Sequence, residues 1–419
     1  MLATAIGPVG PNPAVPGVVM TASISGERAP LTEPTRRLMA AVQEIAPVLR
    51  RSADAAERDS RLTPEAERAL REAGLFRLGV PKRWGGAELA PADSMEVTAE
   101  VALACPSSAW VVMVSYVAQQ IAASFGEQGR QDLWGDGPDV PMCGVFGSTG
   151  VVSAPVEGGL LVSGSWAWAS GSHHADWALL GVPLPGESGA GTERGLALVP
   201  ASALAIEKTW DMAGMRGTGS DTLVADEVFV PYHRLRRFSD VVQGRGLPEE
   251  PLYRIPPGSM TVVSMGPLLG IGRAALQLTL ETVEGGKPMA MSLHARLADS
   301  PSVQAALAEA ATLIDSAHLH LRRSAEFIAA AAASGSTPTL VERARVRMDA
   351  GHASTCLRQA MQALLTVSGA GSFSLTGTLQ RHWRDLETAS RHPTLNPGLA
   401  KEMYGRALVG DGRPVSPMV

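Results

Sequence analysis

The spacing of hydrophobic residues over positions 31–135 predicts a set of helices. In the clearest of these helices Thr63 is a suitable N-cap and Pro64 occupies the first helical position. Gly74 is expected to end the helix. The small apolar residues of this segment fall on one stripe, as in an amphipathic helix: Ala66, Ala69, Leu70 and Ala73.

Short apolar runs broken by glycines replace this pattern between about Pro141 and Pro231 and predict strands. After a link rich in proline and glycine at 248–258, helical periodicity returns over 305–333 and 341–367. The order of helices, sheet and helices predicts an α+β fold. The expected segments are a disordered tail at 1–30, an N-terminal helical domain at 31–138, a β domain at 139–245 and a C-terminal helical bundle at 246–419.

Length and composition bound the class of protein. At 419 residues the chain is longer than one hydrophobic core usually supports, so subdomains are expected. Hydrophobic residues make up 45% and charged residues 18%, which indicates apolar surface buried in an oligomer. With a net charge of −5, the chain lacks the concentrated basic surface that binding to a phosphate backbone requires. Nucleic acid is therefore not an expected partner.

The sequence does not indicate a membrane protein. The most apolar long stretch, Ala109–Phe125, carries Ser115 and Gln119 and so predicts a buried core helix. Residues 1–30 have no basic region before an apolar core, so they are expected to be a tail rather than a signal peptide, and Met20 is an alternative start. Three cysteines, few and far apart, fit reduced thiols in the cytoplasm: Cys105, Cys143 and Cys356.

Two tryptophans and a serine form the first candidate site. Trp166, Trp168 and Ser170 alternate with period two, so they are expected to share one face of a strand. Such a surface suits an isoalloxazine, whose flat ring packs on an aromatic wall and whose N5 needs a hydrogen-bonding partner. The alternative is a pair of tryptophans buried in a β core.

A histidine near the C-terminus is the second candidate. His392 precedes Pro393, and the residue before a proline is driven out of the helical conformation, so His392 is expected at a helix end. An imidazole there can take a proton from a phenol or amine, or hold an oxygen by hydrogen bonding. A structural role is the alternative. Asp385 is expected to form an ion pair with Arg384.

Other motifs favour structural interpretations. The glycine-rich segment 214–221 is either a phosphate cradle or a tight β connection braced by Arg216. Gly270 and Gly272 fall within a helical pattern and are expected to serve helix packing. The adjacent histidines 173 and 174 face opposite ways on an extended chain, so no metal site is expected.

Together, five segments resemble the acyl-CoA dehydrogenase superfamily, and more narrowly its branch of two-component flavin-dependent monooxygenases. These segments are Val80–Gly86, Trp166–Gly171, Ala175–Trp177, Gly214–Asp221 and Val228–Pro231. The resemblance covers about 30–410 and implies an acyl-CoA dehydrogenase-like fold, with a β-barrel-like middle domain and a C-terminal four-helix bundle. It also implies a homotetramer in which flavin lies between the β domain and the bundle, closed by a neighbouring subunit.

The resemblance assigns the site residues. The expected catalytic residues are His392 and Ser170. The cofactor-binding residues are Phe146, Trp168, Ser170, Gly171, Arg296, Gly369, Ala370, Gly371 and Asn396. The substrate-binding residues are Trp110, Ser115, Gln119 and His392. Some phenol hydroxylases of this branch carry a further histidine after the Ser-Ala-Trp run, which is missing here, so an amine or heteroaromatic substrate is an alternative to a phenol.

The implied reaction uses reduced FAD or FMN from a separate NAD(P)H-dependent reductase. Dioxygen and this flavin form a C4a-hydroperoxyflavin, which transfers one oxygen atom to the substrate. Many acyl-CoA dehydrogenases carry a catalytic glutamate where this chain has Arg391, His392 and Pro393. The rival functions are an acyl-CoA dehydrogenase or oxidase with bound FAD, and a non-enzymatic scaffold.

Overall fold

The computed structural model describes residues 31–186, 191–246, 248, 250–413 and 415–416. The predicted tail at 1–30, with Met20, lies outside the described residues. The N-terminal helices are α1 (Glu33–Asp59), α2 (Pro64–Glu72), α3 (Pro91–Ala104), α4 (Pro106–Ala122) and α5 (Glu127–Trp134).

Helix α2 begins as predicted, because the hydroxyl of Thr63 accepts a hydrogen bond from the Ala66 amide at 3.2 Å and Pro64 follows it. Its end differs slightly from the prediction. The helix stops at Glu72, and Gly74 lies in the following turn with a φ of +72°. Glycine adopts this left-handed conformation without steric cost, so it reverses the chain after the helix.

The predicted β region is present as two four-stranded sheets. The first sheet has the order β1-β4-β5-β8 and the second β2-β3-β7-β6. The strands are β1 (Met142–Val145), β2 (Val152–Val156), β3 (Gly159–Trp166), β4 (Trp177–Pro185), β5 (Thr192–Pro200), β6 (Ala205–Glu207), β7 (Thr222–Pro231) and β8 (Leu235–Arg237).

The first sheet is buried on both faces, which explains the continuous apolar run of β4. Leu179 packs with Ile121 of α4 and Leu133 of α5 in one apolar cluster. Leu180 packs on the opposite side with Leu160 of the second sheet. The first sheet therefore lies between the helices and the second sheet, and this sandwich holds the end of β3 close to α4.

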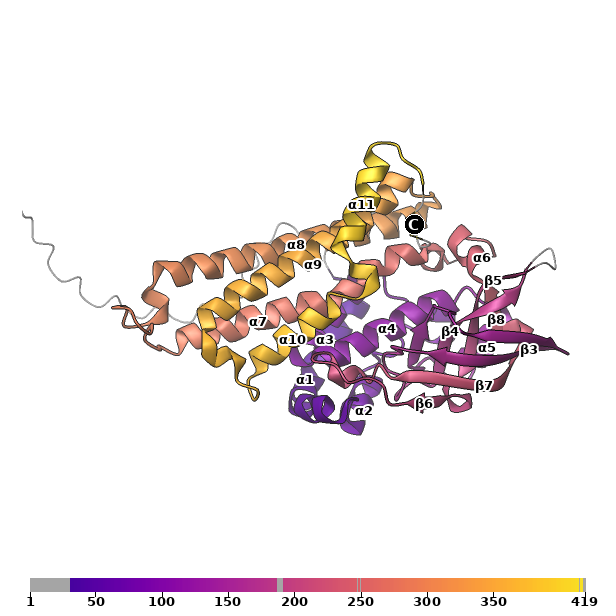
Figure 1. Ribbon diagram of the computed structural model, residues 1–419, viewed down its shortest axis with the longest axis horizontal. Coiled ribbons are helices and arrows are strands. Elements are labelled where there is room, and N and C mark those ends of the chain that lie inside the picture. Colours follow the sequence, from indigo (N-terminus) through magenta and orange to yellow (C-terminus); the bar gives the residue numbers. More distant parts are fainter. Residues whose placement is uncertain (1–30, 187–190, 247, 249, 414, 417–419) are drawn as a thin grey trace, which may run out of the picture.

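The C-terminal part consists of α6 (Phe238–Gln243), α7 (Gly266–Glu284), α8 (Pro301–Ser334), α9 (Leu340–Ser368), α10 (Thr378–Ala389) and α11 (Pro397–Leu408). The helical segments predicted at 305–333 and 341–367 lie within α8 and α9. Helices α7–α10 extend along one end of the long axis and the sheets occupy the other end, with α3 and α4 near the middle (Figure 1). The fold class predicted from the sequence is confirmed.

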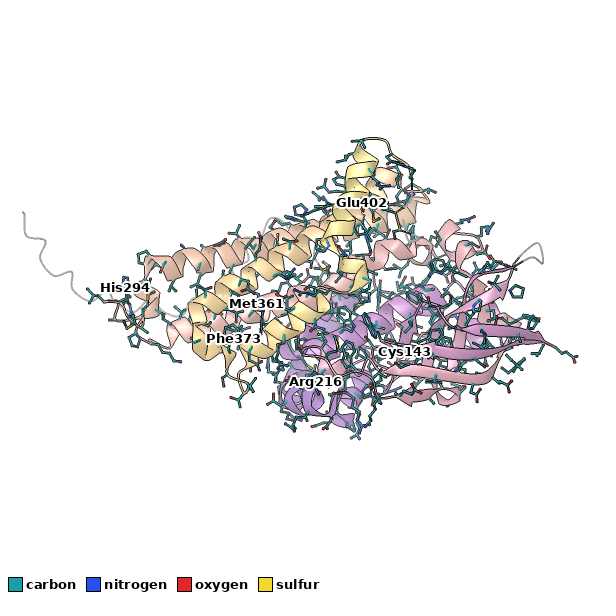
Figure 2. The ribbon with its side chains drawn as sticks, viewed as in Figure 1. Cys143, Arg216, His294, Met361, Phe373 and Glu402 are labelled. Carbon is teal, nitrogen blue, oxygen red and sulfur yellow. The ribbon has the colours of Figure 1, made fainter. Side chains whose placement is uncertain are left out.

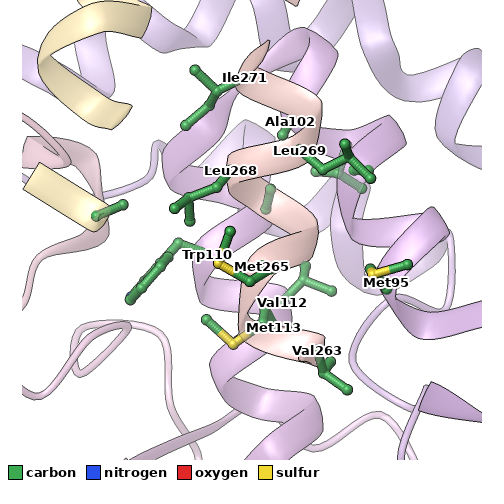
Figure 3. Packing of buried hydrophobic residues seen from close by; sticks show 14 of the residues in the cluster. Met95, Ala102, Trp110, Val112, Met113, Val263, Met265, Leu268, Leu269 and Ile271 are labelled. Carbon is green, nitrogen blue, oxygen red and sulfur yellow. The ribbon is translucent and has the colours of Figure 1, made fainter. Parts of the chain in front are cut away.

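Helix α7 packs closely on its neighbours through its glycines. A Cβ on Gly270 would lie 2.1 Å from the carbonyl oxygen of Ala99, and one on Gly272 would lie 2.8 Å from a methyl group of Leu357. The structural interpretation of these two glycines is therefore correct. The helical stretch Gly258–Glu284 is long and apolar enough to span a membrane, but 89% of its apolar 18-residue window is buried inside the protein. Figure 3 shows side chains of α4 and α7 in this shared core.

Helix α4 is a buried core helix, as predicted for Ala109–Phe125. Its Ser115 and Gln119 are fully buried. The amide of Gln119 donates to the carbonyl oxygens of Phe76 and Val140 and accepts from the Gly79 amide. Ser115 accepts from the Met142 amide at 3.1 Å. Ser115 therefore joins helix α4 to strand β1, and Gln119 joins it to the segment after α2 and to Val140. These contacts favour a structural role for both residues over the predicted contact with substrate.

Candidate functional site

A turn directly after strand β3 carries the tryptophan and serine predicted to bind a flavin. The strand ends at Trp166, whose indole is buried and donates a hydrogen bond to the carbonyl oxygen of Gly181 at 2.9 Å. Trp168 has a φ of +69° and is 64% exposed. The three residues therefore do not share one strand face, because the chain reverses at Trp168.

Backbone hydrogen bonds to the segment before strand β7 hold this turn. The Ala169 amide donates to the carbonyl oxygen of Asp221 at 3.1 Å, and the Gly171 amide donates to that of Thr218 at 2.8 Å. Gly171 has a φ of +80°, and a Cβ there would lie 3.1 Å from Val111 of α4. The turn is thus fixed between the second sheet and α4, with the Trp168 indole directed outward from it.

The hydroxyl of Ser170 lies in a hydrogen-bond chain. Ser170 Oγ accepts from the indole nitrogen of Trp110 at 3.1 Å and lies 2.7 Å from Ser220 Oγ. Ser220 lies 2.7 Å from the hydroxyl of Thr218, which donates to the carbonyl oxygen of Met215. If each hydroxyl donates along this chain, Ser170 donates to Ser220 and keeps a lone pair for a donor in front of the turn.

Trp110 connects Ser170 with His392. The Trp110 and His392 rings meet edge to face, with centroids 5.7 Å apart and planes at 63°. Trp110 is itself 6% exposed and belongs to the main apolar core, so its position is fixed by packing (Figure 3). Trp110 and His392, which are more than two hundred positions apart in the sequence, therefore face one site.

His392 is the N-cap of the short helix η10 (Pro393–Leu395), just after the end of α10, as its position before a proline predicted. Its Nδ1 accepts from the Thr394 amide at 3.4 Å and lies 2.7 Å from the Thr394 hydroxyl. These contacts favour the tautomer that carries its proton on Nε2. The free edge of the ring is therefore a hydrogen-bond donor.

The environment keeps the His392 imidazole neutral. Solvent reaches more than a third of the residue's surface, yet the surrounding protein atoms partly desolvate the imidazole ring. This desolvation and the positive charge of Arg347 lower the pKa of His392 to about 4. At neutral pH the imidazole is uncharged.

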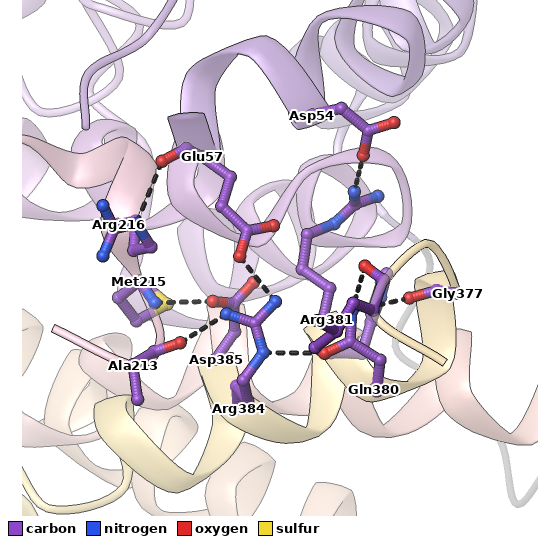
Figure 4. A network of polar contacts seen from close by, with 12 residues as sticks. Asp54, Glu57, Ala213, Met215, Arg216, Gly377, Gln380, Arg381, Arg384 and Asp385 are labelled. Carbon is purple, nitrogen blue, oxygen red and sulfur yellow. Dashed lines mark hydrogen bonds and ion pairs between the residues drawn. The ribbon is translucent and has the colours of Figure 1, made fainter. Parts of the chain in front are cut away.

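Asp385 does not form the predicted ion pair with Arg384. Its carboxylate is buried and accepts a hydrogen bond from the Met215 amide at 2.5 Å, whereas Arg384 pairs with Glu57 at 2.5 Å (Figure 4). Arg216 donates to the carbonyl oxygen of Glu57 and pairs with Asp211. Since the Met215 amide is already bonded, the 214–221 segment is better explained as a braced β connection than as a phosphate cradle.

We expect Asp385→Asn to stabilise the protein at neutral pH but not at acidic pH. Burial raises the pKa of Asp385 from 3.8 to about 6, against the opposing hydrogen bond from Met215. Because the folded pKa is the higher one, the stabilisation linked to the protonated carboxyl is complete below pH 3.8 and is lost as the pH rises through about 6. Asparagine keeps an acceptor for Met215 without the buried charge.

Above pH 6 the variant should exceed the parent in free energy of unfolding by up to about 3 kcal/mol. Urea unfolding at a series of pH values measures this difference. Asp54→Asn is the control, because Asp54 is an exposed carboxylate that pairs with Arg381 in the same network (Figure 4). A difference for Asp385→Asn that stays constant between pH 4 and pH 7 contradicts the assignment.

His173 and His174 have separate structural partners. His173 lies 2.7 Å from the carboxylate of Asp221, and His174 accepts from the Leu62 amide at 3.1 Å. The described residues hold no cluster of three His, Cys, Asp or Glu side chains suited to a metal ion.

The other predicted cofactor residues lie on separate elements of the chain. Phe146 is half-buried just after β1 and Asn396 caps α11, accepting from the Gly398 and Leu399 amides. Arg296 is exposed and pairs with Asp299 at 2.6 Å. It is two residues from His294, which lies at the far end of the helical bundle from Cys143 of β1 (Figure 2). Gly369, Ala370 and Gly371 form an exposed bend after α9, where Gly369 has a φ of +68°.

Two family models match the chain. Residues 32–134 match the acyl-CoA dehydrogenase N-terminal domain and residues 262–397 match the acyl-CoA dehydrogenase C-terminal domain.

The chain is 32% identical over 374 residues to the flavin-dependent monooxygenase oxygenase subunit HsaA of Mycobacterium tuberculosis. This alignment covers 88% of this chain and 94% of HsaA. The chain is also 31% identical over 398 residues to the oxygenase component of the FADH(2)-dependent resorcinol hydroxylase of Rhizobium sp., and that alignment covers 90% of this chain and 95% of the hydroxylase component. The structure of XiaF from Streptomyces sp. in complex with FADH2 and glycerol aligns with a TM-score of 0.86 at 32% identity, covering 92% of this chain and 98% of that one.

Proposed function

Because the chain belongs to the acyl-CoA dehydrogenase family, within its branch of flavin-dependent monooxygenases, we propose that it is the oxygenase component of a two-component monooxygenase. It takes reduced FAD or FMN from a separate flavin reductase and oxygenates an aromatic or heteroaromatic substrate. The observation that carries this proposal is the contact chain from Ser170 through Trp110 to His392.

The turn after β3 fits an isoalloxazine ring. The Trp168 indole is an apolar surface that is 64% exposed, held by a backbone conformation that tryptophan rarely adopts. Such strain persists at sites where the surrounding structure enforces it for a function. Ser170 offers a lone pair beside it, which suits the N5–H group of a reduced flavin. When bound, the reduced flavin supplies the electrons that activate dioxygen.

The protein's own residues hold the reacting groups. Ser170 accepts a hydrogen bond from the cofactor, and Trp110 fixes Ser170 in place through its indole N–H. Apolar packing around Trp110 excludes water from this side of the site, which limits loss of oxygen as peroxide. His392 donates a hydrogen bond from Nε2 to an oxygen of the bound substrate or cofactor, since its Nδ1 is occupied by Thr394.

The carboxylates near His392 argue against dehydrogenation of an acyl thioester. Asp385 is bonded to the Met215 amide, and Glu387 pairs with Arg391 and Arg358. Neither is free to remove an α-proton. We therefore favour oxygenation over the dehydrogenase or oxidase alternative.

A second copy of the chain is part of the proposal. Arg296 and the bend at 369–371 remain proposed cofactor residues, but the 294 region lies at the opposite end of the molecule from β1 (Figure 2). They reach a flavin at Trp168 only if a neighbouring subunit supplies them. Exposed apolar side chains near these segments, Met291, Leu293 and Leu375, fit such an interface. We propose a homotetramer acting in the cytoplasm.

Isotope labelling tests the proposed function. The protein is supplied with NADH, a flavin reductase, FAD or FMN, and ¹⁸O₂ in the presence of a panel of phenols, indoles and aromatic amines. We expect a product that contains one ¹⁸O atom. Oxidation of an acyl thioester without ¹⁸O incorporation, together with no oxygenated product across the panel, contradicts the proposal.

A further inference from the structure

Arg347 of helix α9 is a buried cation without an acidic partner. It is 4% exposed, and within the described part of the chain its hydrogen bonding is limited to Nη1, which donates to the Thr261 hydroxyl at 2.6 Å. Burial lowers the pKa of Arg347, and no carboxylate opposes this effect. A buried guanidinium without a counter-charge is costly, so its presence points to a ligand that supplies the missing charge.

The same helix shows how a structural charge is normally satisfied. Asp349 is 1% exposed, and Arg323 and Arg345 bond to its carboxylate at 2.6 and 2.9 Å. Ser324 donates a further hydrogen bond to it at 2.7 Å. The buried acid of α9 is therefore neutralised by the protein, whereas the buried base two residues earlier is not.

Arg347 lies on the side of α9 that faces the His392 loop. Gly351, one turn later on the same face, packs so closely that a Cβ there would lie 3.3 Å from Cα of Pro397 and 2.9 Å from Cβ of Ala400. Helix α9 also contacts η10, of which His392 is the N-cap. The positive charge is felt at the imidazole, because it contributes to the lowered pKa of His392. The cation therefore belongs to the same site as His392.

The free side of the guanidinium has the geometry for a carboxylate. Since Nη1 is directed at Thr261, the edge formed by Nε and Nη2 remains, and its two parallel N–H groups match the two oxygens of a carboxylate. We propose that Arg347 anchors a carboxylate of the substrate, so that the enzyme acts on aromatic acids whose ring lies beside His392. This inference rests on the proposed function and narrows its substrate class.

Binding without flavin tests the anchor separately from catalysis. Isothermal titration calorimetry on the purified protein compares aromatic acids with their primary amides on the same ring: 4-hydroxyphenylacetate, indole-3-acetate and 4-hydroxybenzoate. Each pair keeps the ring and any phenol, so only the carboxylate changes. We expect at least one acid to bind ten times more tightly than its amide. If no acid exceeds its amide, the proposal is overturned, whatever the outcome of the ¹⁸O₂ assay.

Two substitutions test whether Arg347 causes the preference for the acid over its amide. Arg347→Met should remove the difference between acid and amide, and Arg347→Lys should keep part of it, because lysine retains the charge without the paired N–H groups. Arg347→Met should also raise the melting temperature, since it removes an uncompensated buried charge. Thr261→Val is the matched control, because it removes the Thr261 hydroxyl and leaves the guanidinium. An acid preference that survives in Arg347→Met also overturns the proposal.

Discussion

Replacing His392 by asparagine is expected to slow substrate oxygenation by about 10²–10⁴-fold without unfolding the protein. Asparagine is a good N-cap, so its side chain can still accept the Thr394 amide and begin helix η10. The shorter side chain does not reach the position of Nε2. The variant therefore loses the donor that faces the site while the fold is kept.

The control for this prediction is His392→Gln, whose amide nitrogen extends further toward the position of Nε2. It should retain more of the rate than the asparagine variant. Single-turnover oxygenation and the melting temperature are measured for both.

In the parent protein the imidazole of His392 is neutral at every pH well above its pKa of about 4, so this residue should produce no change of the oxygenation rate between pH 5.5 and pH 8. Equal activity of parent and asparagine variant contradicts the role of His392.

Replacing Trp168 by alanine is expected to weaken the binding of reduced flavin by about 10–100-fold, because stacking on an aromatic side chain contributes about 1–3 kcal/mol. The melting temperature should change little, since Trp168 is 64% exposed. Anaerobic titration with FADH₂ and FMNH₂ measures the dissociation constants.

Trp168→Phe keeps an aromatic surface and should lose only a few-fold in affinity. Phe229→Ala is the matched control, because Phe229 is a 50% exposed aromatic residue of strand β7 outside the proposed site. Its effect on flavin binding should be negligible. Unchanged affinity in Trp168→Ala shows that the ring binds elsewhere.

Much of the fold follows from local patterns. The helix starting at Pro64, the helices of the bundle and the position of His392 before Pro393 depend on nearby residues, so the sequence predicts them. The turn at Trp168 could not be predicted in this way. Its period-two pattern continues past Trp166, but hydrogen bonds to Thr218 and Asp221, about fifty residues away, reverse the chain there.

The candidate site shows the same limit. Ser170, Trp110 and His392 were expected at the site, and the structure brings them together through contacts between distant segments. Arg347 was not recognised, because its sequence neighbours include Asp349, Arg345 and Arg343 and only the structure shows which of these charges are paired. Ser115 and Gln119 show a similar limit, because a polar residue in an apolar helix can line a pocket or join distant segments. Only the long-range contacts to Met142 and Phe76 favour the second role.

The most direct measurement is a crystal structure of the protein soaked anaerobically with reduced FAD. We expect the isoalloxazine to stack on the Trp168 indole, with its N5 within hydrogen-bonding distance of Ser170 Oγ and His392 facing the opening beside the ring. A flavin bound away from this turn, or a ring with a carboxylate poised over it in place of His392, contradicts the account.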